Sequence, residues 1–318
     1  MLGALAVWYC FKNIEFDKFV TQLKSADYFY IGLSMAFSFI AFIIRALRWN
    51  IMINTLGYKP TVCNTYNAVV IGYIANLAVP RIGEIARCAA LHKTNRIPVN
   101  SLFGTVVTER IIDIVSLFAI MFLVFFIKMD FFSRFMYERI IAPWKPVFEN
   151  LSFASTLLIA IAIIILIIAA YIILKRLLKR PSMHKFRILL TGLADGLKSV
   201  FRMKKKFHFI GYTVVIWLCY WLGGYLIIKA LPSTAALTAA DGLLLTVLGS
   251  LGWVVPVPGG FGTFHTLIAW GLMMYGISFE EGIVFATLSH ETQLLLMVFF
   301  GIIALISVSL TTKSLGRS

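Results

Sequence analysis

A charged, proline-containing stretch interrupts one of the apolar segments of this chain. Residues 74–87 read Ile-Ala-Asn-Leu-Ala-Val-Pro-Arg-Ile-Gly-Glu-Ile-Ala-Arg. This cannot be a lipid-facing helix, because hydrocarbon offers no partner for a broken backbone or for charge. Pro80 removes a backbone donor and Gly83 permits a turn, so two half-helices are predicted to meet at residues 79–83, with Glu84 opening the second.

The break is expected to face a polar pocket enclosed by protein. Freed backbone amides and the side chain of Arg81 would line that pocket, since charges at membrane depth usually serve a function. In an alternative interpretation, the segment is a kinked helix in which Arg81 and Glu84 merely pair with each other.

Composition extends this argument from one segment to the whole chain. Of the 318 residues, 60% are hydrophobic and 14% are charged, which is typical of an integral membrane protein. No long polar segment is left for a soluble catalytic domain, so one membrane domain over residues 1–318 is expected. Much of the formal charge of +15 lies in residues 175–207, whose only acid is Asp195. Such a loop indicates the cytoplasmic side of a membrane rather than a nucleic-acid partner.

The apolar segments predict an all-α, polytopic integral membrane protein. About six full spans are expected, together with an interfacial helix and two re-entrant broken helical hairpins. The expected spans are a shortened first helix at residues 1–11 and residues 28–56, 101–126, 151–174, 208–231 and 280–310; the interfacial helix is residues 13–27, and the hairpins are residues 61–92 and 243–275. Residues 130–150 are expected to form a mixed-charge loop.

Charged side chains inside two of the spans must point into the protein. Glu109 and Asp113 share a helix face at spacing four, and Arg110 meets Asp113 at spacing three. The two acids are expected to orient Arg110; the alternative is a self-neutralising structural triad. Arg45 and Arg48 lie three apart near the end of their span, where snorkelling to the interface is the alternative to an inward role.

A second break is predicted at residues 256–262, which read Pro-Val-Pro-Gly-Gly-Phe-Gly. Prolines and glycines at this density do not stay helical, and the preceding Gly249 and Gly252 are expected to interrupt the segment as well. Exposed backbone at membrane depth implies surrounding protein or water, so the turn is expected to offer backbone donors to a ligand.

The two halves of the chain repeat one order of elements. With the basic residues 175–207 placed inside, the span, broken hairpin and span of residues 28–126 run opposite to those of residues 208–310. This is the inverted-topology repeat of many secondary transporters, in which discontinuous segments meet at a midplane site. The expected location is the cytoplasmic membrane, with the C-terminus inside.

In order and spacing, several motifs resemble the flippase-like family named after the transmembrane region of lysylphosphatidylglycerol synthase, of the multiple peptide resistance factor type. The matching residues are Arg48-Trp49; Asn76 with Pro80-Arg81-Ile82-Gly83-Glu84 and Arg87; Glu109-Arg110 with Asp113; and Pro258-Gly259-Gly260-Phe261-Gly262. The resemblance implies lipid translocation between leaflets by a stand-alone member without the soluble synthase domain of fused relatives. It leaves room for a separate lipid-synthesising enzyme as a partner and for a homo-oligomer.

Two histidines depart from the pattern of that family. Many relatives have a carboxylate a few residues after the glycine turn, where this chain has His265, and an Arg in the last helix, where it has His290. A histidine at either place could titrate near neutral pH. The alternative for both is a hydrogen-bonded structural role.

The leading hypothesis is a flippase-like transporter with a pocket for a phosphate headgroup where the hairpins meet. Arg81 and Glu84 are expected to contact the headgroup, and Gly259–Gly262 to supply backbone donors. The full set of expected substrate-binding residues is Arg48, Asn76, Arg81, Glu84, Arg87, Glu109, Arg110, Asp113, Gly259, Gly260, Gly262, His265 and His290.

Two other functions remain open at this point. An intramembrane transferase would need a nucleophile or general base, or a metal-binding cluster, and the chain has no Asp-x-Asp motif. A non-transporting scaffold would recruit a partner through the basic loop. No metal site is expected, because the cysteines lack metal-like spacing, and no direct ATP hydrolysis is expected, because no P-loop is present. The chain is expected to be neither an enzyme nor a cofactor-binding protein.

Overall fold

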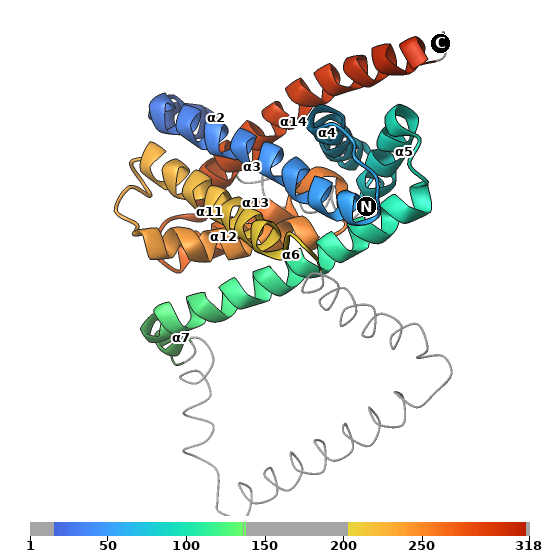
Figure 1. Cartoon of the computed structure of the whole chain (residues 1–318). Coiled ribbons are helices and arrows are strands. Elements are labelled where there is room, and N and C mark those ends of the chain that lie inside the picture. The colour runs from blue at the N-terminus through green and yellow to red at the C-terminus, as the bar shows by residue number, and fades with distance from the viewer. Residues whose placement is uncertain (1–15, 136, 138–202, 316–318) are drawn as a thin grey trace, which may run out of the picture. The chain divides into compact units, whose positions relative to one another are not determined.

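A computed structural model describes residues 16–135, 137 and 203–315, and all regular structure in them is helical (Figure 1). The elements are α2 (Phe16–Lys24), α3 (Tyr28–Thr55), α4 (Val62–Ala78), α5 (Gly83–Asn95), α6 (Val99–Ile127), α7 (Met129–Phe135), α11 (Lys206–Ala230), α12 (Ala239–Val254), the 3-10 helix η4 (Pro258–Gly260), α13 (Thr263–Met273) and α14 (Phe279–Leu315). The expected first helix, the span at 151–174 and most of the basic loop lie outside the described residues, so the number of six spans stays a prediction.

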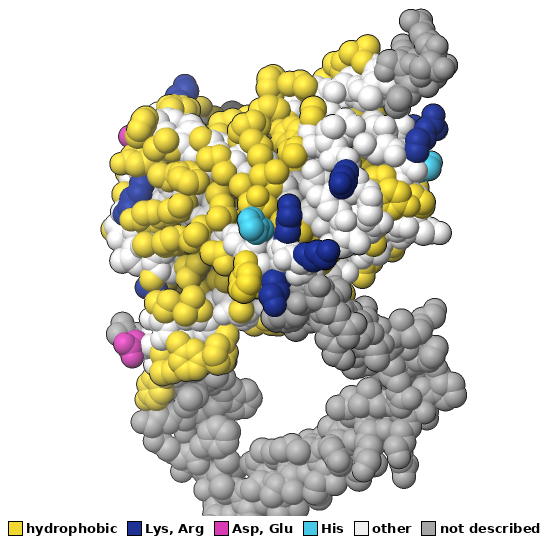
Figure 2. Space-filling view, viewed as in Figure 1, with side chains coloured by type: hydrophobic (Ala, Val, Ile, Leu, Met, Phe, Trp, Pro, Cys, Tyr) yellow, Lys and Arg dark blue, Asp and Glu magenta, His cyan; other side chains and the backbone are white. Residues whose placement is uncertain are grey.

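Four of the described helices are long and apolar enough to cross a membrane: α3, α6, α11 and α14. They confirm the spans predicted at residues 28–56, 101–126, 208–231 and 280–310. Large hydrophobic side chains such as Phe118, Leu295 and Phe299 are exposed on their outer faces. Figure 2 shows hydrophobic side chains over much of the visible face of the described part. Such a surface suits hydrocarbon rather than water.

The chain divides into two units, residues 1–121 with 199–318 and residues 122–198. In the first unit, α3 packs along α11, and α14 packs against both α13 and α4. Small residues let these helices approach closely, as is common in membranes. Gly223 of α11 lies beside Ser34 of α3, and Gly301 of α14 lies against Ile74 of α4.

The described residues of the second unit are helical where a loop was expected. Residues 129–135 form α7, so the predicted loop at 130–150 is wrong at its start. Asp130 lies in the first turn of α7, where an acid favours the helix. The ring of Phe132 packs 5.5 Å from that of Phe125 at the end of α6. Aromatic packing therefore supports a helix in a stretch whose mixed charge predicted a loop.

The first broken hairpin forms as predicted, but a different residue makes its turn. Helix α4 ends at Ala78 and α5 begins at Gly83, so the kinked-helix interpretation is wrong. The left-handed residue is Arg81, with φ 64°, and not Gly83. Gly83 instead allows α5 to touch α4, because a Cβ there would overlap the carbonyl oxygen of Gly72 and the amide of Asn76.

The second hairpin is broken over a shorter stretch than predicted. A capping box between Thr238 and Asp241 starts α12, which continues through Gly249 and Gly252 to Val254. These glycines leave room for the ring and backbone of Phe264 from α13, so they serve packing and not interruption. The break itself is confirmed at the turn, where φ is positive at three glycines: Gly259, Gly260 and Gly262.

The two breaks lie next to each other. Helix η4 of the second break contacts α4 of the first hairpin. Arg81 Nη2 donates to the backbone carbonyl of Val254 at 3.2 Å, and the side chain of Leu77 packs beside Gly259. The hairpins therefore meet at their breaks, as the sequence predicts.

Candidate functional site

Seven charged side chains from three helices form one connected set of ion pairs, here called the charge network. They are Arg45 and Arg48 of α3, Glu84 and Arg87 of α5, and Glu109, Arg110 and Asp113 of α6. Charges at membrane depth need partners within the protein or from a ligand.

Glu109 is the centre of the charge network. Its side chain is fully buried and pairs with three arginines. Oε1 lies 3.2 Å from Arg45 Nη2 and 3.0 Å from Arg48 Nη2, and Oε2 lies 3.0 Å from Arg87 Nη1. One carboxylate therefore holds α3, α5 and α6 together through charge-assisted hydrogen bonds.

Arg45 and Arg48 point into the protein. Arg48 is fully buried, and Asp113 accepts from both guanidinium groups, at 2.8 Å from Arg48 Nη1 and 3.3 Å from Arg45 Nη2. Two hydroxyls of α11 complete the site: Tyr220 accepts from Arg45 at 2.8 Å and Thr213 accepts from Arg48 at 3.2 Å. The snorkelling interpretation is therefore wrong for both arginines.

Arg110 lies at the edge of the network, with a side chain that is 37% exposed. Its Nη1 lies 3.4 Å from Asp113 Oδ2, as the spacing of three predicts, and its Nε lies 3.4 Å from Glu84 Oε1. Glu109 faces the other three arginines, because consecutive residues of a helix do not face each other. Asp113 and Glu84 thus orient Arg110, in place of the expected pair Glu109 and Asp113.

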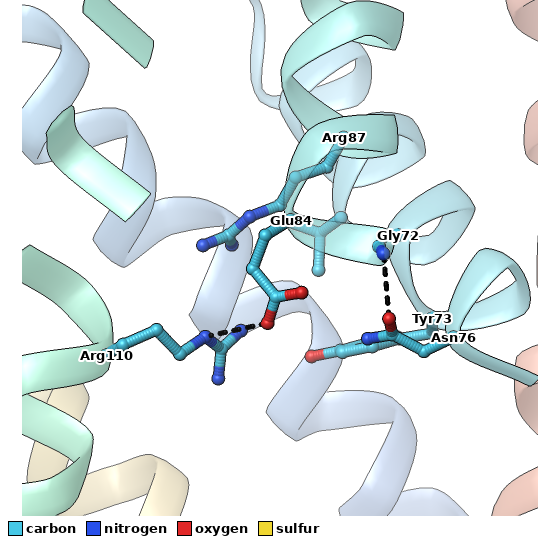
Figure 3. Close-up of a pocket in the computed structure, with 8 residues that line it drawn as sticks. Gly72, Tyr73, Asn76, Glu84, Arg87 and Arg110 are labelled. Atoms are coloured by element: carbon cyan, nitrogen blue, oxygen red, sulfur yellow. Dashed lines mark hydrogen bonds and ion pairs between the residues drawn. The ribbon is translucent and has the colours of Figure 1, made fainter. Parts of the chain in front are cut away.

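A small polar pocket adjoins Arg110 and Glu84 (Figure 3). It is lined by Val69, Gly72, Tyr73, Asn76, Gly83, Glu84, Arg87 and Arg110. Asn76 accepts from the backbone N–H of Gly83 at 2.7 Å, which satisfies one amide freed at the start of α5. The cavity volume is about 10 Å³, enough for one water molecule. A larger ligand requires the pocket to widen, and the Arg110–Glu84 contact lies at its edge.

Arg87 has donors that the charge network does not use. The residue is 3% exposed, and its guanidinium lies 4.6 Å from the centre of the Trp49 ring. Nη1 pairs with Glu109, whereas Nη2 and Nε are buried without a hydrogen-bond partner among the described residues. Four arginines face three carboxylates, which leaves one positive charge in excess. Buried donors and uncompensated charge are costly, so this site favours an anion.

Two expected headgroup contacts lie outside this network. Arg81 is exposed and hydrogen-bonds to the second hairpin instead of facing the pocket. In the glycine turn, the N–H groups of Gly260 and Phe261 already donate to the carbonyls of Val257 and Pro258. The pocket therefore belongs to the first hairpin and α6, and the structure does not bring Arg81 or these turn amides to it.

The two histidines lie together beside the second break. His290 is fully buried, with Nε2 2.7 Å from the Gly259 carbonyl oxygen and Nδ1 3.0 Å from Glu291 Oε1. His265 is 1% exposed, and its Nε2 lies 3.9 Å from the same oxygen of Glu291. His290 thus has the hydrogen bonds expected of the structural interpretation.

Several residues of these sites were missing from the set predicted from sequence. Arg45, Glu291 and Tyr73 each carry a detectable signal, since each is a polar group within an apolar helix. Thr213 and Tyr220 carry none, because nothing in the sequence shows that α11 packs against α3.

The fold and the buried ion pairs define an all-α, multi-pass membrane protein with two broken hairpins. The chain belongs to the family described as the lysylphosphatidylglycerol synthase TM region, which it matches over residues 1–301. It is similar to the UPF0104 membrane protein MJ1595 of Methanocaldococcus jannaschii, at 29% identity over 140 residues. That match covers 43% of this chain and 41% of the relative, so it spans about two fifths of the relative's length. No solved structure matches the chain.

Proposed function

We propose that this protein translocates a lipid with a phosphate headgroup between the leaflets of the cytoplasmic membrane. Its family is associated with lipid flipping, and the multi-pass fold suits that activity. The observation that carries the proposal is the excess positive charge of the network beside a pocket lined by unused donors of Arg87. A phosphate is the part of a lipid that such donors recognise.

The headgroup is proposed to bind where Arg110 meets Glu84. Arg110 would exchange its contact with Glu84 for a phosphate oxygen, which widens the pocket and exposes the unused Nη2 of Arg87. The hydroxyl of Tyr73, which is buried without a hydrogen-bond partner among the described residues, adds a third donor. An anion bound there balances the network charge, whereas a headgroup without a negative charge does not.

The route is proposed to follow an inverted repeat. Helix α3, the α4–α5 hairpin and α6 form the first set, and α11, the α12–α13 hairpin and α14 repeat that order. Opposite orientations of the two sets would give alternating access, with the C-terminus inside. Acyl tails would stay in the bilayer against the exposed apolar faces. The protein is then a transporter and not an enzyme, and a separate enzyme would supply its lipid.

The test is leaflet exchange in vesicles reconstituted with the full chain. The probes are phosphatidylglycerol, lysylphosphatidylglycerol and phosphatidylcholine, each with a fluorophore on an acyl chain so that the headgroup stays intact. A membrane-impermeant reductant bleaches the outer leaflet, and continued loss of signal reports exchange. We expect exchange above that of empty vesicles, reduced at least about tenfold by Arg110→Gln, the equivalent of about 1.4 kcal/mol in binding.

Two other cation-removing variants serve as matched controls. Arg81→Gln removes a cation at the break but outside the charge network, and Lys93→Gln removes an exposed one from α5. Both are expected to keep exchange within about twofold of wild type. Loss of exchange in Arg81→Gln with normal exchange in Arg110→Gln would move the headgroup site to the break. No exchange of any of the three lipids would contradict translocation of phosphate-headgroup phospholipids.

A further inference from the structure

We propose that His265, His290 and Glu291 form a binding site for a divalent transition-metal ion, with Zn²⁺ as the best match. One ligand atom from each residue lies within 4.8 Å of the other two. Two imidazoles and one carboxylate are a ligand set that Zn²⁺ accepts. The site is separate from the charge network, and the inference does not rest on the proposed transport function.

The hydrogen bonds of His290 indicate that a cation lies between its Nδ1 and Glu291 Oε1. Nε2 lies 2.7 Å from the carbonyl oxygen of Gly259, and because a carbonyl only accepts, Nε2 carries a proton. The other nitrogen, Nδ1, lies 3.0 Å from Glu291 Oε1. With Nε2 protonated, a neutral ring presents a lone pair at Nδ1 to a carboxylate that also has only lone pairs. A proton or a metal ion must therefore lie between these two atoms.

A third ligand favours a metal ion over a proton. His265 Nε2 lies 3.9 Å from the same oxygen, Glu291 Oε1, so three potential ligands converge on one place. A shared proton needs only two of them. Tetrahedral zinc with bonds of about 2.0–2.1 Å places its ligand atoms roughly 3.3 Å apart. The ligand atoms lie within 4.8 Å of one another, so ion binding would bring them closer by at most about 1.5 Å.

The surroundings of the cluster are those of a metal site. The Gly259 carbonyl holds the remote nitrogen of His290, which is the usual outer contact of a metal-binding histidine. Aromatic rings enclose the imidazoles: Trp253 stacks 5.1 Å from His290, and Phe261 packs 4.9 Å from it. The side chain of Glu291 is 36% exposed, which leaves a path of entry and an open fourth position.

A bound ion would join the second hairpin to α14. His265 lies on α13, and His290 and Glu291 lie on α14, while Gly259 of the break is held through the ring of His290. The ion would therefore fix the break against α14.

The experiment measures zinc on the full chain, purified in detergent without a polyhistidine tag. The protein is stripped with a chelator, incubated with Zn²⁺ and separated from free metal by gel filtration, and its metal content is determined by mass spectrometry. We expect one zinc per chain and an unfolding temperature that rises with added Zn²⁺. Co²⁺ in place of zinc should give the visible absorption of a four-coordinate site.

Conservative variants assign the ion to its ligands. Glu291→Gln and His265→Gln should each weaken zinc binding by more than about 100-fold, because even outer-contact losses cost about 10- to 100-fold. Glu281→Gln on the same helix, whose carboxylate bonds to Ser278, and His92→Gln in the first hairpin should bind as wild type. All variants are checked for a single folded peak by gel filtration.

The wild-type measurement can overturn the proposal without any variant. If folded wild-type protein binds less than one zinc per chain at micromolar free Zn²⁺, the proposed site is contradicted. A proton, and not a metal ion, would then lie between His290 and Glu291. If folded Glu291→Gln and His265→Gln both still bind one zinc per chain at wild-type affinity, the ion lies elsewhere. Since the readout is metal content, failure here is distinct from failure of lipid exchange.

Discussion

The two breaks of this protein solve the same physical problem in different ways. At each break a helix ends within an apolar chain, and the freed backbone groups and charges need partners. At the first break, Asn76 binds the freed amide of Gly83, and α5 is held by Glu109 through Arg87. At the second, a ring nitrogen of His290 binds the carbonyl of Gly259, and aromatic rings pack around it.

The two breaks therefore differ in what holds them: charged groups at the first and tight packing at the second. The first hairpin is joined to its neighbours by ion pairs, which can exchange partners with an anionic ligand. The second is joined by a short hydrogen bond and ring packing, which hold one geometry. We infer that the first break provides binding and the second provides a fixed support. Each of the following predictions tests that division.

The largest effect is expected from Glu109→Gln. This variant removes the buried charge that three arginines share and leaves Arg87 without its acidic partner, so we expect a loss of about 3–5 kcal/mol in unfolding free energy. Unfolding of the purified protein by denaturant in mixed micelles measures the change. The matched variant of the second break is Glu291→Gln, whose carboxylate is 36% exposed and should cost less than about 1 kcal/mol.

Equal losses in these two variants would contradict the division. They would mean that the second break also depends on buried charge, or that solvent reaches Glu109. A loss confined to Glu109→Gln would show that ion pairs hold only the first hairpin.

A smaller effect is expected from Gly260→Ala. Gly260 has φ 72°, and a Cβ there would lie 3.2 Å from the ring of Trp253. Left-handed backbone costs a residue with a Cβ about 1–2 kcal/mol, and the ring leaves little room, so we expect at least that loss in unfolding free energy. The control is Gly104→Ala on α6, which has open space around it and should be neutral or stabilising. A neutral Gly260→Ala would show that the second break is more adaptable than its packing indicates.

Much of this fold could be predicted from sequence, because few backbone structures and few positions for charged side chains are stable in hydrocarbon. Segment lengths indicated the described spans, and Pro80 and the Pro258–Gly262 turn marked both breaks. The same argument required Glu109 and Asp113 to point inward. These inferences depend only on what a bilayer cannot accommodate.

The pairing of charges could not be predicted, because it depends on which helices pack together. Sequence spacing pointed to Arg110 and Asp113, which share one helix, but not to Arg45 or Arg87 as partners of Glu109. The predicted role of Gly83 as the turn residue was wrong for the same reason, since its contact with Gly72 is visible only once α4 and α5 are paired. Glu291 joins two histidines that lie on different helices, and only the packing of α13 on α14 shows it.

The smallest effect concerns Arg81, where the two breaks touch. Arg81 has φ 64° and donates one hydrogen bond of 3.2 Å to Val254, from an exposed side chain. Arg81→Ala loses that bond and keeps the backbone strain, so we expect a loss of about 0.5–1 kcal/mol. Arg81→Gly also loses the bond but relieves a left-handed strain of about 1 kcal/mol, so it should unfold near wild type. The difference between the two variants therefore measures the strain less the conformational entropy that glycine loses on folding, and Arg81→Ala measures the bond between hairpins. Wild-type stability in Arg81→Ala would mean that the bond contributes nothing and that packing of α4 on η4, with Leu77 against Gly259, joins the breaks.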